Sequence, residues 1–166
     1  MYRRFWFFLT ILFIFSVSFT FGEEGASGVK DDFWISLGAD AAFYDFEGLT
    51  FGGSFSLGYG TGTLVGLKLV WYITGEIINT LELNFILRFY LLGANVYWGP
   101  YLQFMGGPSL FNRSGDFSVP SYSGSFSAGA GFGWRFIFGD RWFLEPALRF
   151  GYPYFAGFGI SAGVRF

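Results

Sequence analysis

The chain has 166 residues, a length that suits a single domain. Its 26 glycines and 25% aromatic residues, beside only 13% charged residues, are too glycine-rich and too apolar for an ordinary soluble domain. The net charge of −2 argues against nucleic acid as a partner, and the absence of cysteine and histidine excludes disulfides, thiol chemistry and histidine-based catalysis.

Residues 1–22 predict a secretory signal peptide. Arg3 and Arg4 precede an apolar run over 5–21, the order of charge and hydrophobicity that marks export signals. An uncleaved anchor is the alternative, because a run of about 17 residues is at the lower limit for a helix that spans a bilayer. The acidic sequence that follows favours cleavage, which would leave 23–32 as a short periplasmic segment.

Beyond this leader the recurring pattern is alternation with a period of two, which sends successive side chains to opposite faces of a strand. Residues 158–166, for example, place an apolar residue at every second position, with glycine, serine or arginine between them. The same alternation occurs in eight segments: 33–43, 50–59, 65–73, 81–89, 96–104, 122–138, 141–150 and 158–166.

The two faces of these segments distinguish a soluble sandwich from a membrane barrel. In a sandwich the second face meets water and is rich in charged residues and threonine. Here it is mostly glycine and serine, as in the crowded inside of a narrow barrel, whereas the first face is as apolar as a lipid-facing surface. Ten strands would leave too few residues for each crossing of the membrane. We therefore expect an all-β, eight-stranded, antiparallel, up-and-down transmembrane β-barrel over 33–166.

An even number of strands places both ends of the barrel on the periplasmic side. Short turns near 60–62, 92–95 and 139–140 then lie in the periplasm. The longer segment 107–121 becomes an external loop.

Four tryptophans on the lipid face predict aromatic girdles at the membrane interfaces, where indole rings prefer the headgroup level. They are Trp71, Trp98, Trp134 and Trp142. Trp34 does not fit this set, because its odd or even position in the alternation of its strand (its parity) directs its side chain inward.

These features resemble the small eight-stranded outer-membrane β-barrels, similar to the transmembrane domain of outer-membrane protein A and to OmpX and OmpW. The chain end looks like the signal that the barrel-assembly machinery reads, carried by Phe158, Ile160, Ala162, Val164 and Phe166. The resemblance implies a bacterial outer-membrane location, outer-membrane lipid as surroundings, the assembly machinery and periplasmic chaperones as partners during biogenesis, and a monomer.

The inward face collects charges that must be paired or hydrated, because an unpaired charge in a partly dry interior is costly. They are Asp40, Lys68, Glu82, Arg88, Arg135, Glu145, Arg149 and Arg165. We expect a structural network that fills the lumen. In the alternative, Glu82 and Glu145 exchange arginine partners and open a narrow water path, which would make the protein a small or gated pore.

Other functions have weaker support in the sequence. The barrel enzymes that this fold resembles use a histidine, so we expect no enzymatic activity and no cofactor. Carboxylates at Asp45, Glu47 and Asp116 could hold a cation such as calcium, but a few acidic loop residues are usually only solvated, so we expect no metal. The aromatic and charged residues of 107–121 make surface binding or adhesion a third possibility, with a merely solvated loop as its alternative.

Overall fold

The computed structural model describes residues 32–44, 48–60, 62–73, 79–92, 98–112 and 122–166. These residues form eight strands: β1 (Asp32–Tyr44), β2 (Gly48–Gly60), β3 (Thr63–Ile73), β4 (Asn79–Tyr90), β5 (Gly99–Asn112), β6 (Tyr122–Phe138), β7 (Trp142–Tyr152) and β8 (Tyr154–Arg165). No helix in these ranges is long and apolar enough to cross a membrane. The predicted signal peptide lies outside the described residues.

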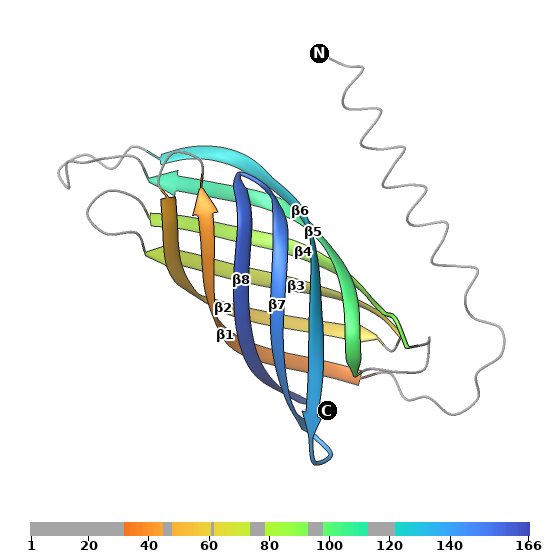
Figure 1. Cartoon of the computed structure of the whole chain (residues 1–166). Coiled ribbons are helices and arrows are strands. Elements are labelled where there is room, and N and C mark those ends of the chain that lie inside the picture. The colour runs from red at the N-terminus through yellow and green to blue at the C-terminus, as the bar shows by residue number, and fades with distance from the viewer. Residues whose placement is uncertain (1–31, 45–47, 61, 74–78, 93–97, 113–121) are drawn as a thin grey trace, which may run out of the picture.

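The strands form one closed antiparallel barrel in which each strand pairs with its sequence neighbours and β8 returns to pair with β1 (Figure 1). At the seam Trp34 lies opposite Arg165, and the amide of Phe166 donates a hydrogen bond of 2.8 Å to the carbonyl of Phe33. The predicted eight-stranded barrel is therefore confirmed. β1 begins at Asp32, one residue before the predicted boundary.

The turn between β6 and β7 closes at one end of the barrel. Gly139 takes a φ of 62° there, in the left-handed region that glycine enters without steric cost. The amide of Arg165 donates to the carbonyl of Arg141 at 2.9 Å, so this turn also adjoins the end of β8. The beginning of β1, the end of β8 and the β6–β7 turn thus lie at the same end.

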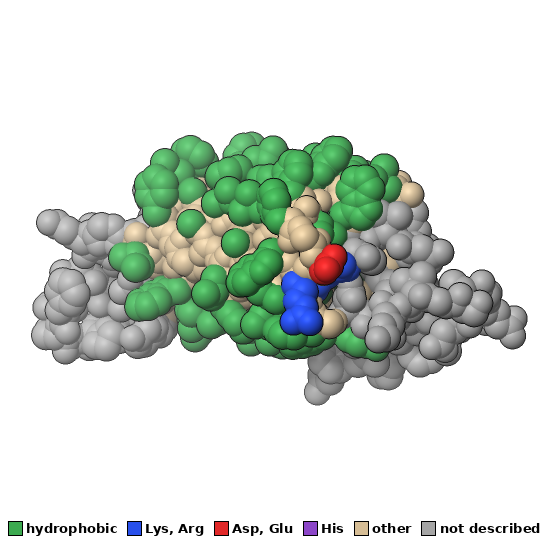
Figure 2. Space-filling model, turned by 90° about the horizontal axis from the view of Figure 1, so that it is seen from below, with side chains coloured by type: hydrophobic (Ala, Val, Ile, Leu, Met, Phe, Trp, Pro, Cys, Tyr) green, Lys and Arg blue, Asp and Glu red, His purple; other side chains and the backbone are tan. Residues whose placement is uncertain are grey.

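Alternation in the sequence becomes a division between the two sides of the barrel wall. The outward side chains are apolar along the strands, with Leu37 69% and Phe85 66% exposed. Among the described side chains, exposed charges occur only around the β6–β7 turn, at Asp140 and Arg141, with the half-buried Arg165 beside them at the end of β8. Figure 2 shows this arrangement on one face, where charged side chains gather in one place on a largely hydrophobic surface.

Candidate functional site: the charged lumen

Seven of the eight charged residues that parity directs inward lie inside the barrel, on five strands. They are Asp40 on β1, Lys68 on β3, Glu82 and Arg88 on β4, Arg135 on β6, and Glu145 and Arg149 on β7. Each side chain is at most 13% exposed. They form two clusters, which we name the Asp40 cluster (Asp40, Lys68, Glu82, Arg149) and the Glu145 cluster (Arg88, Arg135, Glu145).

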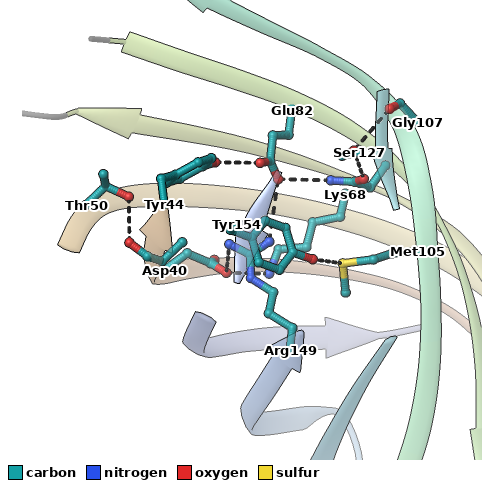
Figure 3. A network of polar contacts seen from close by, with 12 residues as sticks. Asp40, Tyr44, Thr50, Lys68, Glu82, Met105, Gly107, Ser127, Arg149 and Tyr154 are labelled. Carbon is teal, nitrogen blue, oxygen red and sulfur yellow. Dashed lines mark hydrogen bonds and ion pairs between the residues drawn. The ribbon is translucent and has the colours of Figure 1, made fainter. Parts of the chain in front are cut away.

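The Asp40 cluster pairs two acids with two bases (Figure 3). Lys68 Nζ donates to Asp40 Oδ1 at 2.8 Å. Arg149 lies between the two carboxylates, with one nitrogen 3.6 Å from Asp40 Oδ1 and another 3.6 Å from Glu82 Oε2. The hydroxyl of Tyr44 donates to Glu82 Oε1 at 2.6 Å, so this carboxylate is held by a neutral donor as well as by an ion pair.

Neutral polar side chains extend this cluster towards β6. Asn84 Nδ2 donates to Glu82 Oε2 at 3.4 Å, and Ser127 Oγ donates to Asn84 Oδ1 at 2.6 Å. Both residues are at most 1% exposed. The alternation of the strands predicts that they face inward, but the sequence does not reveal that they link Glu82 on β4 to β6.

The Glu145 cluster has two arginines for one carboxylate. Arg88 Nη1 donates to Glu145 Oε1 at 2.6 Å, and Arg135 Nε donates to the same oxygen. Arg88 Nη2 also donates to Gln103 Oε1 at 3.2 Å. Because one carboxylate balances one positive charge, this cluster has one base in excess.

Arg165, the eighth predicted member of the network, is not among the buried charges. Its Nε donates to the backbone carbonyl of Asp140 at 2.7 Å, in an exposed position on the β6–β7 turn. Arg165 lies opposite Trp34 at the end of β8, and its long side chain reaches the neighbouring turn. This contact places the guanidinium group at the rim of the barrel.

Two buried apolar layers, rich in aromatic rings, enclose the charges. The Trp34 layer, at the end where β1 begins, consists of Trp34, Leu64, Tyr90, Tyr101 and Phe143. The Tyr44 layer, at the end where β1 stops, consists of Ala42, Tyr44, Val70, Tyr72, Phe111 and Tyr154. Sequence reasoning placed some of these residues on the inward face without recognising that rings from different strands meet at the same height.

The aromatic rings also stabilise the arginines. The guanidinium carbon of Arg88 lies 4.0 Å from the ring centre of Tyr101, and that of Arg135 lies 4.1 Å from the ring centre of Phe143. At such distances a cation is attracted to the face of the ring, and the attraction grows when water is excluded. The aromatic layers thus fill the two ends of the lumen, and the rings of the Trp34 layer stabilise the two arginines of the Glu145 cluster.

Glycines on the inward face provide the space for these rings. A Cβ added at Gly133 would lie 2.4 Å from the ring of Tyr101, one added at Gly163 would lie 2.3 Å from Phe143, and one added at Gly58 would lie 2.6 Å from Trp34. The small residues that predicted a crowded lumen are therefore the places where aromatic side chains lie against the wall.

Replacing Gly133 by alanine should lower the free energy of unfolding by about 1–3 kcal/mol, because the new methyl group overlaps the buried ring of Tyr101. Urea titration of the refolded protein in lipid vesicles would measure this change. Gly53→Ala is the control, since its added Cβ meets only Gly38 O at 3.9 Å and should change stability by less than about 0.5 kcal/mol. Equal costs at the two positions would contradict the packing argument.

One narrow cavity lies between the two charged clusters and has residues of both in its lining, including Lys68, Arg88, Glu145 and Arg149. About 20 Å³ of it can hold the centres of water molecules, which is room for roughly one or two waters. The described part of the lumen therefore has a small cavity at mid-height and an aromatic layer at either side.

The predicted external loop 107–121 is wrong in its first part. Residues 107–112 belong to β5, and Phe111 is 6% exposed within the Tyr44 layer, so its ring is not part of an external surface. Residues 113–121 lie outside the described residues, together with Asp45, Glu47 and Asp116. Among the described residues no group of three or more acidic side chains is placed to hold a metal ion.

The other predicted site residues lie on the outer wall. Trp71, Trp98, Trp134 and Trp142 are 39–64% exposed, whereas Trp34 is 1% exposed in its layer. The residues of the proposed assembly signal alternate on β8 and its end. Phe158, Ile160, Ala162 and Phe166 are exposed, and Val164 is half-buried.

Comparisons with known proteins agree on the fold. No protein-family model matches the chain. No curated protein sequence matches it either. Among solved structures, the N-terminal β-barrel domain of Pseudomonas aeruginosa OprF aligns with a TM-score of 0.56 and 18% identity, over 81% of this chain and 97% of that one.

Two further structures align over a similar range. Neisserial surface protein A gives a TM-score of 0.57 at 18% identity, over 86% of this chain and 98% of that one. The outer-membrane protein OprG of Pseudomonas aeruginosa gives 0.53 at 11% identity, over 81% and 95%. The chain thus has the fold of small outer-membrane β-barrels, and the predicted resemblance is confirmed at the level of fold.

Proposed function

We propose that the protein is an integral β-barrel of a bacterial outer membrane, with a mainly structural role and a lumen closed by its own side chains. The observation that carries the proposal is the distribution of polar and apolar side chains, which is the reverse of that in a soluble protein. Large apolar side chains cover the outside of the described strands, while the charges of mid-strand positions lie inside. Such an outer surface is unsuited to water, because soluble monomers rarely expose large contiguous apolar patches.

The strands also have the dimensions that a membrane requires. Each has 11–17 residues, and about 9–11 tilted residues cross the hydrocarbon of a bilayer. Closure of the sheet between β1 and β8 pairs the backbone groups that an open edge would expose to lipid. Both features support insertion of this barrel as a single unit.

The biogenesis that fits this proposal starts with export through the signal peptide 1–22 and delivery by periplasmic chaperones. The barrel-assembly machinery would then recognise the alternating side chains at the end of β8. In the membrane, the four outward tryptophans would lie at the interfaces and the barrel would work as a monomer, surrounded by outer-membrane lipid.

A closed lumen supports the structural role over the pore. An open path would have to pass the Trp34 layer, the Glu145 cluster, the Asp40 cluster and the Tyr44 layer in turn. The cavity between the clusters accommodates only roughly one or two water molecules. Exchange of arginine partners by Glu82 and Glu145 would rearrange the clusters and leave both aromatic layers in place.

We expect the refolded protein to give no discrete conductance steps in planar lipid bilayers, because both ends of the lumen are filled. Glu82→Ala should also give none, since it leaves the aromatic layers intact. Reproducible openings of one size in the wild-type protein, altered by Glu82→Ala, would instead establish the gated pore.

Folding of the same samples is checked on an SDS gel. A closed barrel should migrate differently before and after boiling, as the sheet resists the detergent until it is heated. Loss of this shift, or absence of the protein from the outer-membrane fraction of the cells that express it, would contradict the membrane-barrel proposal itself.

A further inference from the structure

The seven charged side chains inside the barrel do not balance one another. Four are basic (Lys68, Arg88, Arg135, Arg149) and three are acidic (Asp40, Glu82, Glu145). The Asp40 cluster is neutral, with two of each sign, so the excess positive charge belongs to the Glu145 cluster. An uncompensated charge in a desolvated interior is costly unless a counter-charge lies nearby.

The same region has more hydrogen-bond donors than acceptors. None of the three guanidinium nitrogens of Arg149 makes a hydrogen bond of normal geometry, because its two carboxylate contacts are 3.6 Å long. Arg88 Nε and Arg135 Nη2 likewise lack a partner within the described structure. Arginine has only donors, so the groups that complete these nitrogens must be acceptors.

The central cavity is where such an acceptor fits. It is lined by Arg88 from the Glu145 cluster and by Lys68 and Arg149 from the Asp40 cluster, with Gln103 beside Arg88. The side chain of Arg149 is 2% exposed and faces this space. Three basic side chains from three strands therefore line one small volume between the aromatic layers, together with the two carboxylates of Asp40 and Glu145, so the charges at the cavity sum to one positive.

We propose that the central cavity binds one small inorganic anion with the charge and size of chloride, which neutralises the excess positive charge of the lumen. An acceptor in this position serves Arg88 and Arg149 together, and it leaves each existing ion pair in place. The cavity has room for roughly one or two water-sized particles, which accommodates a monatomic anion and excludes an organic carboxylate or a phosphate ester. This site depends on the barrel and its lumen, and it goes beyond the structural role proposed above.

The test compares stability in two sodium salts at equal concentration. The protein is refolded from urea into vesicles in a buffer whose only added salt is either sodium chloride or sodium gluconate, so that the anion can enter before the aromatic layers close. We expect a higher urea midpoint in chloride, with a dependence on chloride concentration that saturates, because a ligand that binds only the folded state stabilises it. Equal midpoints in the two salts would overturn the proposal and leave water as the content of the cavity.

Gln103→Glu separates a bound anion from a general salt effect. The substitution keeps the shape of the side chain and gives Arg88 a carboxylate of its own, so the lumen contains four bases and four acids. We expect this variant to have the same urea midpoint in chloride and in gluconate. A preference for chloride that persists in Gln103→Glu would show that the anion acts elsewhere and would contradict the proposal.

Crystals of the wild-type protein grown in sodium bromide provide a measurement that does not depend on any variant. Bromide resembles chloride in charge and is located by its anomalous scattering. We expect a peak between Arg88 and Arg149 in the central cavity. A cavity without anomalous density would overturn the proposal, even if Gln103→Glu failed to fold. The gel shift shows separately whether the wild-type barrel is folded.

Discussion

Replacing Leu83 by arginine is expected to lower the free energy of unfolding by about 2–4 kcal/mol in lipid vesicles, the cost of a charge on the lipid face near the bilayer midplane. Leu83 lies near the middle of β4, and its outward side chain is 40% exposed. Urea titration of the refolded variant, followed by tryptophan fluorescence, would measure the change.

The matched control is the same substitution at Phe89, on the same face of the same strand but one residue from its end. Near the interface an arginine reaches the headgroups, so the cost should fall to about 0–1 kcal/mol. A cost that is independent of position along β4 would mean that this face does not meet a bilayer, and it would contradict the membrane proposal. The gel shift does not test this point, because it reports only that the barrel is folded.

The second large effect is expected for Glu145→Gln. The substitution preserves shape but leaves Arg88 and Arg135 without a negative partner in a buried site, and breaking a buried ion pair from one side costs about 3–5 kcal/mol. The measurement is again the free energy of unfolding in vesicles.

A second variant shows whether charge is the cause. In Arg135→Gln combined with Glu145→Gln, the lumen returns to its original excess of one positive charge, so the double variant should recover part of the stability lost by Glu145→Gln alone. The double-mutant cycle then gives the coupling between Arg135 and Glu145. Additive losses would mean that the two side chains act independently, contrary to their shared hydrogen bond.

The strand faces could be predicted from the sequence because alternation is a local property. Once β4 is recognised, the inward direction of Glu82 and Arg88 follows from its period of two. Heights could not be predicted in this way, because they depend on the stagger of strands around the barrel. The meeting of Tyr44, Tyr72 and Tyr154 in one layer therefore does not follow from the alternation.

The predicted loop begins at Gly107, whereas β5 continues through Gly107 and Pro108 to Asn112. Pairing between β4 and β5 is interrupted at Gly107 and Pro108, from Glu82 opposite Ser109 to Phe85 opposite Gly106. Proline lacks the amide hydrogen that the ladder needs, and a Cβ at Gly107 would lie 1.9 Å from the carbonyl oxygen of Leu83. Pairing with β6 continues through both residues, so the strand persists on that side.

The alternation along most of each strand also restricts how the length of this chain can vary. Deleting one residue within a strand would shift all later side chains of that strand to the opposite face, so that phenylalanines would enter the lumen and arginines would face lipid. Two-residue changes preserve parity but slide one strand past its neighbours and separate the members of the Asp40 and Glu145 clusters. Insertions and deletions should therefore be tolerated in the connections between strands. Each position within a strand should accept only substitutions that suit the side of the wall that it faces.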